Sequence, residues 1–256
     1  MIDEATYQWA IAELGNREGA GDARRLRDAA DGDVAHFRKM VAVRKAGRPI
    51  AQILGYRDFW KDRFRVTPDT LDPRPETEHL IEAALQYGPF DRILDLGTGT
   101  GCVALSLARE FPHADILATD ISAKALAVAQ GNAVILKITT VRFVHSDWYS
   151  DVEGQYDLIV SNPPYIPEDD LKDLNMEVLQ YEPIEALTPG QDGMSAYRAL
   201  FAGAQKHLNP KGYMIFEHGF DQAEQLHSLG RQNGFDRKSF IKDLSGKDRI
   251  SVFQEN

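Results

Sequence analysis

The sequence has one cysteine, no long apolar run and a shortage of positive charge, and each shortage excludes a class of protein. Cys102 alone can form neither an intramolecular disulfide nor a zinc site of the CxxC type. No apolar run approaches the roughly 20 residues that a membrane-spanning helix needs. The first residues carry acidic side chains where a signal or transit peptide carries basic ones. We therefore expect a soluble protein of the cytoplasm that has no membrane partner.

Acidic residues outnumber basic ones over the whole chain, but not in its first third. The 256 residues include 29 Lys and Arg against 39 Asp and Glu, a net charge of −10. Residues 1–80 hold fourteen of each sign, so the excess of negative charge lies in residues 81–256. Because an acidic domain is a poor electrostatic match for a nucleic acid, we expect no direct nucleic-acid partner.

One stretch in the first part of the chain is strongly basic. Residues 38–65 carry nine basic side chains and two acidic ones. We hypothesise that this stretch contacts an acidic face of a protein partner. The alternative is an ordinary solvated surface of helices and a hairpin.

The first part of the chain has the pattern of a small helical domain followed by a hairpin. Strand-forming and aromatic residues over Tyr56–Val66 predict a β-hairpin that turns at Lys61-Asp62. Three prolines follow within residues 67–75 and predict an irregular linker. Apolar stripes bounded by Gly or Asp predict three helices, over Glu4–Leu14, within Asp22–Ala30 and within Asp33–Ala46.

From Thr77 onward, short strand-like runs alternate with helical segments. Thr77 can cap a helix that ends at Gly88. Such alternation indicates βαβ units and an α/β fold with a mostly parallel, doubly wound sheet. The strand-like runs are Arg92–Leu96, Asp115–Asp120, Val141–Val144, Tyr156–Val160, Gly212–Glu217, Lys238–Lys242 and Arg249–Phe253, and the helices between them include Ser122–Gly131, Ala196–Leu208 and Asp221–Gly230. We predict three parts, namely a helical domain (1–54), a hairpin and linker (55–76) and an α/β domain (77–256).

A glycine-rich loop follows the first strand of the α/β domain. It reads G-x-G-x-G after an acid, and Cys102 stands where a dinucleotide-binding fingerprint has its last glycine. Nineteen residues beyond the loop, Asp120 ends the second strand and can accept both ribose hydroxyls of an adenosine. Asp147 and Trp148 follow the third strand and offer an acid and a flat ring to the adenine. The alternative is that the glycines only make a sharp turn.

This arrangement resembles the class I S-adenosylmethionine-dependent methyltransferases. The resemblance implies a Rossmann-like, mostly parallel seven-stranded sheet and S-adenosylmethionine as the cofactor. The cofactor-binding residues that we predict are Asp95, Gly97, Thr98, Gly99, Thr100, Gly101, Asp120, Asp147, Trp148 and Asn162.

A second motif, Asn162-Pro163-Pro164-Tyr165, ends the fourth strand. The carboxyl end of a parallel strand is where ligands bind in this fold, and consecutive prolines hold the backbone rigid. The Asn162 side-chain oxygen and the Pro163 backbone oxygen could grip the two hydrogens of a planar NH2 group. They would act by orientation and electrostatics rather than as a strong base.

We therefore predict Asn162 and Pro163 as catalytic residues and Asn162, Pro163, Pro164 and Tyr165 as substrate-binding residues, with the tyrosine ring packed on the planar group. A proline-rich turn without function is the alternative. The motif resembles that of amino-methyltransferases acting on adenine, cytosine, guanine or glutamine, so by itself it leaves the acceptor open.

The segment Leu71–Glu78 (LDPRPETE) narrows the choice. With the helical N-terminal part it resembles the release factor glutamine methyltransferases, although Asp72 stands where that family usually has an aliphatic residue. Further matching motifs are Tyr181–Pro183, Gly190–Gly193, Glu217–Gly219 and Asp243–Arg249. The resemblance implies methylation of the side-chain amide nitrogen (N5) of the glutamine in the Gly-Gly-Gln loop of class I peptide chain release factors. It also implies that residues 1–54 recognise this substrate.

Three other functions stay open on the sequence alone. An exocyclic-amine methyltransferase for DNA or RNA shares the Asn-Pro-Pro-Tyr motif, but we find no basic target-recognition domain. An NAD-dependent oxidoreductase and a non-catalytic factor that binds the release factor are the others.

Several reactive side chains are better explained as structural. The acids at residues 168–170 fit a solvated loop, and we predict no metal site. His218 suits a structural hydrogen bond, Ser195 lacks the context of a hydrolase nucleophile, and Cys102 fits a small packed residue.

Overall fold

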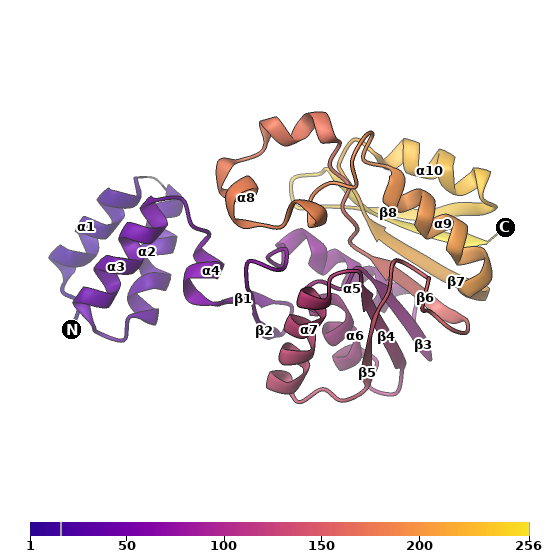
Figure 1. Cartoon of the computed structure of the whole chain (residues 1–256), viewed down its shortest axis with the longest axis horizontal. Helices are drawn as coiled ribbons and strands as arrows, with labels where there is room; N and C mark the ends of the chain where they lie inside the picture. The colour runs from indigo at the N-terminus through magenta and orange to yellow at the C-terminus, as the bar shows by residue number, and fades with distance from the viewer. Residues whose placement is uncertain (16, 256) are drawn as a thin grey trace.

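The computed structural model describes residues 1–15 and 17–255, with the backbone alone for residues 17 and 18. A small helical bundle lies at one end of the molecule and a sheet with helices on both faces lies at the other (Figure 1). The bundle consists of α1 (Glu4–Leu14), α2 (Arg17–Ala29) and α3 (Val34–Lys45). Its own core includes Leu26, Phe37 and Val41.

The sequence predicts the ends of α1 and α3 well because capping residues mark them. The Asp3 side chain accepts a hydrogen bond from the Thr6 amide, and Gly15, at φ 71°, ends α1. Helix α2 begins before the predicted Asp22, since Gly19 lies inside the helix rather than breaking it. A Cβ on Gly19 would come within 3.0 Å of Leu14, so the glycine allows close packing of α1 and α2.

The predicted hairpin is present, but its turn is one residue earlier than predicted. After the short α4 (Ile50–Leu54), strands β1 (Tyr56–Phe59) and β2 (Asp62–Arg65) pair with Phe59 opposite Asp62. The turn is therefore Trp60-Lys61 and not Lys61-Asp62. Long-range contacts explain this register, because the Trp60 indole donates to Glu110 (2.8 Å) and Asp62 binds Arg109 (2.6 Å).

A mostly parallel sheet of seven strands forms the core of the second part, as predicted. The strand order is β5-β4-β3-β6-β7-β9-β8, and β9 runs in the direction opposite to the other six strands. The order reverses beside β3, which is the switch point where ligands bind in such sheets. The strands are β3 (Arg92–Leu96), β4 (Asp115–Asp120), β5 (Val141–His145), β6 (Tyr156–Ser161), β7 (Leu208–Glu217), β8 (Phe235–Lys242) and β9 (Asp248–Glu255).

Helices cover both faces of this sheet. Helices α5 (Glu78–Tyr87), α6 (Cys102–Glu110) and α7 (Ala123–Leu136) pack on one face, and α9 (Ser195–His207) and α10 (Ala223–Gln232) pack on the other. Successive strand residues alternate between the two cores, as a period of two requires. Within the described residues, no helix is long and apolar enough to cross a membrane.

The predicted end of one helix is wrong, and Thr77, although it is the N-cap residue of α5 as predicted, makes no capping bond; in both cases tertiary contacts override local ones. Helix α7 continues through Gly131 to Leu136, since the next residue, Asn132, is fully buried and anchors the helix to the hairpin. The Asn132 amide accepts from the Arg65 amide (2.8 Å) and donates to the Arg65 carbonyl (3.0 Å). Thr77 has helical dihedrals and makes no capping bond, because its hydroxyl is bonded elsewhere.

The long irregular stretch between β6 and α9 contains three short helices. They are η2 (Glu168–Asp173), α8 (Met176–Tyr181) and η3 (Ile184–Ala186). Figure 1 shows this segment rising above the sheet on the side of the helical bundle. It contacts the first part of the chain through Arg44 and Glu177 (2.9 Å) and through Gln52, which donates to the Tyr181 carbonyl (2.8 Å).

Candidate functional site

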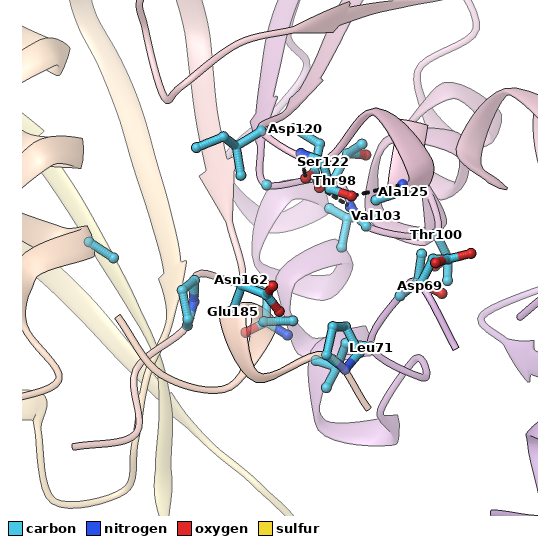
Figure 2. Close-up of a pocket in the computed structure, with 18 of the residues that line it drawn as sticks. Asp69, Leu71, Thr98, Thr100, Val103, Asp120, Ser122, Ala125, Asn162 and Glu185 are labelled. Atoms are coloured by element: carbon cyan, nitrogen blue, oxygen red, sulfur yellow. Dashed lines mark hydrogen bonds between the residues drawn. The ribbon is translucent and has the colours of Figure 1, made fainter. Parts of the chain in front are cut away.

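A cavity of about 910 Å³ opens at the carboxyl ends of the central parallel strands. That size is within the range of small-molecule sites. Figure 2 shows Asp120, Ser122 and Thr98 grouped together in the cavity, with Asn162 and Glu185 in a separate group. Of the predicted site residues, those that line the cavity are Asp95, Gly97, Thr98, Gly99, Thr100, Asp120, Asp147, Trp148, Asn162 and Pro164.

The glycine loop lies along one wall of the cavity. Gly97 and Gly99 have φ of 74° and 55°, a region that favours glycine. The amides of Gly97 and Thr98 both donate to the Thr119 carbonyl (2.9 Å each), so the loop is tied to β4. Gly101 does not line the cavity, and a Cβ there would lie 3.1 Å from Ala129 on α7. Gly101 therefore serves close helix packing in this structure.

Asp120 joins the glycine loop to the start of α7. Its Oδ2 accepts from the Gly99 amide (2.9 Å) and its Oδ1 accepts from the Ser122 amide (2.8 Å). Each carboxylate oxygen has two lone pairs, so one on each oxygen is free to accept from a hydroxyl in the cavity. Burial raises the pKa of Asp120, and the two backbone donors oppose that rise.

Asp95 lies behind the loop, almost without exposure to solvent. Its carboxylate accepts from the Thr98 hydroxyl at 2.6 Å. Burial raises the pKa of Asp95 to about 7, and the bonds from Thr98 and from the Ala104 amide act in the opposite direction. The Asp95 side chain therefore both holds the glycine loop in place and lines the cavity.

Asp147 and Trp148 lie together at the cavity, after β5. Trp148 has a φ of 48°, and its carbonyl accepts from the Ser146 hydroxyl at 2.8 Å. The Ser150 hydroxyl donates to the Asp147 carbonyl at 2.8 Å. These two bonds hold the turn that presents an acid and a ring to the cavity.

Asn162 is held through the nitrogen of its side-chain amide. Nδ2 donates to the Thr77 hydroxyl oxygen at 3.1 Å, which leaves Oδ1 as the unused acceptor of this cavity-lining side chain. Just before it, the Ser161 hydroxyl donates to the Leu96 carbonyl at 2.6 Å and joins the ends of β6 and β3.

The rest of the Asn-Pro-Pro-Tyr motif divides between the cavity and the protein interior. Pro164 lines the cavity, whereas Pro163 is buried and Tyr165 packs against the core that contains α9. The Tyr165 carbonyl accepts from Gln222 at 2.8 Å. A Cβ on Gly193 would lie 2.4 Å from that carbonyl, so glycine is required for the close approach of the two loops.

Two segments that the sequence patterns did not predict as part of the site also line the cavity. They span residues 68–73 and 183–189. Arg74 joins them by an ion pair in which its Nη2 lies 2.7 Å from both carboxylate oxygens of Glu182. Glu182 is buried, and burial raises its pKa to about 6 despite the guanidinium. The sequence shows both charges, but nothing in it indicates that they meet across 108 positions.

Asp72 lies beside this ion pair. It is buried, and its Oδ1 has no hydrogen-bond partner among the described residues. Burial raises the pKa of Asp72, while Arg74 and Arg57 act to lower it.

The side chains that we interpreted as structural make structural contacts. His218 bonds to the Ser251 hydroxyl (2.9 Å) and to the Gly219 carbonyl (2.8 Å), and burial lowers its pKa. The Ser195 hydroxyl donates to the Pro189 carbonyl at 2.9 Å. Cys102 is buried, which raises its pKa to about 12. Over residues 1–15 and 17–255, no three His, Cys, Asp or Glu side chains are grouped to hold a metal ion.

Comparisons with known proteins agree with this arrangement. The methyltransferase small domain family matches residues 75–192. A release factor glutamine methyltransferase of Cereibacter sphaeroides is 50% identical over 217 residues, which cover 84% of this chain and 78% of that protein. One from Neisseria gonorrhoeae is 41% identical over 256 residues, covering 98% and 90%.

The fold itself recurs among solved structures. A methyltransferase from Pyrococcus furiosus superposes with a TM-score of 0.59 at 21% identity, and the match covers 84% of this chain and 95% of that one. At that level of identity the likeness concerns the fold, which is the class I methyltransferase fold.

Proposed function

Because the chain belongs to the release factor glutamine methyltransferases, S-adenosylmethionine-dependent enzymes, we propose that it methylates N5 of the glutamine in the Gly-Gly-Gln loop of class I release factors. We place this reaction in the cytoplasm. The observation that supports the chemistry most directly is the orientation of Asn162, whose amide nitrogen is bound by Thr77 and whose oxygen is left for an N–H donor.

The cavity suits S-adenosylmethionine in size and in chemistry. Asp120 offers one free lone pair on each oxygen to the ribose hydroxyls, and Gly97 and Gly99 let the backbone approach a ligand closely. Asp147 and Trp148 offer an acceptor and a ring to the adenine. The cofactor, when bound, supplies an electrophilic methyl group.

Asn162 and Pro163 would orient the substrate amide for methyl transfer. An amide nitrogen is a poor nucleophile because its lone pair is delocalised into the carbonyl. The Asn162 Oδ1 and the Pro163 carbonyl would each accept one N–H of the substrate amide, which turns the nitrogen toward the methyl donor. Pro164, which lines the cavity, would flank the planar group. The methylated nitrogen then loses a proton to solvent, so no strong base is required.

The proposed function is tested by methyl transfer in vitro. Purified protein is incubated with methyl-labelled S-adenosylmethionine and a class I release factor, and the modified residue is mapped by mass spectrometry. We expect one methyl group on the Gly-Gly-Gln glutamine. A matched arm contains DNA and RNA in place of the release factor, and label found only there would show the alternative, an exocyclic-amine methyltransferase.

Asn162→Ala tests the role of the amide within this reaction. We expect kcat to fall about 100-fold or more, because a preorganised polar contact to the reacting group is lost. Binding of S-adenosylmethionine, measured by calorimetry, should be mostly retained. Turnover that survives the substitution would contradict the mechanism in which Asn162 grips the amide.

A further inference from the structure

Three polar side chains from separate parts of the sequence form a line that starts at the cavity, which Asn162 and Thr77 both line. Asn162 follows β6, Thr77 is the last residue of the 3-10 turn η1 (Pro75–Thr77), and Glu217 is the last residue of β7. Strands β6 and β7 are parallel neighbours, so their carboxyl ends lie side by side. Thr77 and Glu217 are each only 2% exposed. The line therefore leads from the cavity into the protein interior.

The hydrogen bonds along this line have a defined direction. The Thr77 hydroxyl has a single proton to donate and accepts the Asn162 Nδ2 proton at 3.1 Å. Its own proton is then available to the Glu217 carboxyl, with which the Thr77 side chain is hydrogen bonded. Because Glu217 accepts at the far end, the hydroxyl oxygen of Thr77 faces Asn162 as an acceptor.

We propose that Thr77 and Glu217 are positioning residues that hold the Asn162 amide with its oxygen toward the substrate. This inference rests on the proposed function, because it explains how that function's key acceptor is oriented. A rotated Asn162 amide would present its NH2 group to the NH2 of the substrate, and two donors cannot bond to each other. Thr77 and Glu217 disfavour that rotation, because the rotated amide would place Oδ1 against the Thr77 oxygen and two acceptors would face each other.

Burial of the Glu217 carboxyl costs free energy that packing alone does not explain. Its Oε2 is buried and has no hydrogen-bond partner in the described part of the chain. The two cations that act to lower its pKa are paired with other carboxylates, since Arg249 bonds to Asp243 (3.0 Å) and Arg74 to Glu182. An apolar side chain of similar size would avoid the cost of a buried, partly unsatisfied carboxyl. Its contact with Thr77 provides a role that an apolar residue could not perform.

Four variants test this arrangement against a merely structural role. Thr77→Val and Glu217→Met remove the hydroxyl and the acceptor while keeping the volume, and Thr77→Ser and Glu217→Gln keep them. We expect the first two to lower kcat by about 10–100-fold, with unchanged calorimetric affinity for S-adenosylmethionine and no loss of melting temperature. The conservative pair should restore kcat close to the wild-type value.

A double variant and a control sharpen the test. Thr77→Val combined with Glu217→Met should be no worse than Thr77→Val alone, because both changes break the same line. Ser106→Ala is the control, since Ser106 on α6 has an equally buried hydroxyl that bonds to no described residue. This control should leave kcat unchanged.

The proposal is overturned if Thr77→Val and Glu217→Met keep the wild-type kcat. It is also overturned if all four variants lose activity and melting temperature together, because packing alone would then explain the loss. Failure of the proposed function looks different, since wild-type protein would then not methylate a release factor at all. If the label goes to a nucleic-acid amine instead, the same four variants measured on that acceptor decide whether the line orients Asn162.

Discussion

At the scale of single residues, two buried carboxyl groups behind the cavity behave unlike ordinary acids. Burial raises the pKa of both Asp95 and Glu217 to about 7. In the unfolded chain the same groups release their protons near pH 4. Between pH 4 and 7 the folded state thus binds more protons than the unfolded state, so these groups make the free energy of unfolding fall as the pH rises.

Glu217→Gln should remove one of these titrations. Below about pH 5 the variant and the wild type are expected to melt at similar temperatures. As the pH rises from 5 to 7 the variant should become the more stable of the two by a few degrees, since about 1 kcal/mol corresponds to 2–4 °C in a chain of this size. Thermal unfolding at four pH values measures the difference.

The control for this comparison is Glu110→Gln. Bonds from Lys61 and Trp60 lower the pKa of Glu110, so it stays ionised throughout this pH range and its replacement should give a constant offset. A difference between Glu217→Gln and wild type that does not change from pH 5 to 7 would show that the pKa of Glu217 is not raised in the folded protein.

Residue types and their order predict the chemistry of the site better than they predict which way its side chains point. The glycine pattern and the acids after β4 and β5 could be recognised because the fold brings the ends of parallel strands together. The direction of the Asn162 amide could not be recognised from the sequence, because it depends on Thr77, which lies 85 positions away. Thr77 itself has the sequence context of a helix cap, and only the structure shows its hydroxyl used otherwise.

At the scale of elements, local patterns fail where distant contacts decide. The sheet strands are predicted to within a few residues, and the central strands β3, β4 and β6 most closely, because each of these three is a buried apolar run between turns. Gly131 suggests a helix end, but burial of Asn132 against the hairpin carries α7 further. The irregular stretch after β6 has no periodic apolar pattern, so its short helices and its place on the cavity were not predicted.

The ion pair between Arg74 and Glu182 connects two of the cavity-lining segments. The Glu182 side chain is 2% exposed and that of Arg74 is 36% exposed. The carboxylate therefore has little solvent to stabilise its charge and relies on the guanidinium, whereas the guanidinium is still partly solvated. Removing Arg74 alone would leave a buried charge without its partner.

Arg74→Met should therefore loosen the segment over residues 183–189. We expect hydrogen exchange to increase there and the Kd for S-adenosylmethionine to rise about 10-fold, which corresponds to about 1.4 kcal/mol. The matched variant is Arg74→Met with Glu182→Met, which removes both charges and should recover part of the affinity. If the double variant binds the cofactor no better than Arg74→Met, loss of the arginine side chain rather than the unpaired charge is responsible.

At the scale of the whole molecule, charge is unevenly distributed between the two parts of the chain. The excess of negative charge lies beyond residue 80. Arg44 connects the helical bundle to the segment after β6, because it binds Asp22 within the bundle (2.6 Å) and Glu177 on α8 (2.9 Å). The hypothesis that residues 38–65 contact an acidic partner therefore applies less to Arg44, whose charge is already paired within the chain.

Two other basic side chains on α3 are more exposed to solvent. Lys39 is exposed, and the Lys45 side chain is 60% exposed although it forms a surface ion pair with Glu13 (2.5 Å). We propose that these two lysines help to dock the release factor. Lys39→Glu with Lys45→Glu should raise the KM for the release factor several-fold and leave the KM for S-adenosylmethionine unchanged. The effect should shrink as salt is added, because exposed charges are screened.

The matched control carries the same change in net charge at the opposite end of the molecule. Lys206 on α9 and Lys238 on β8 are exposed, and Figure 1 shows α9 and β8 in the part of the molecule away from the helical bundle that contains α3. Lys206→Glu with Lys238→Glu should leave the KM for the release factor close to the wild-type value. If this control raises that KM as much as the α3 pair does, net charge alone weakens the encounter, and α3 has no specific part in docking.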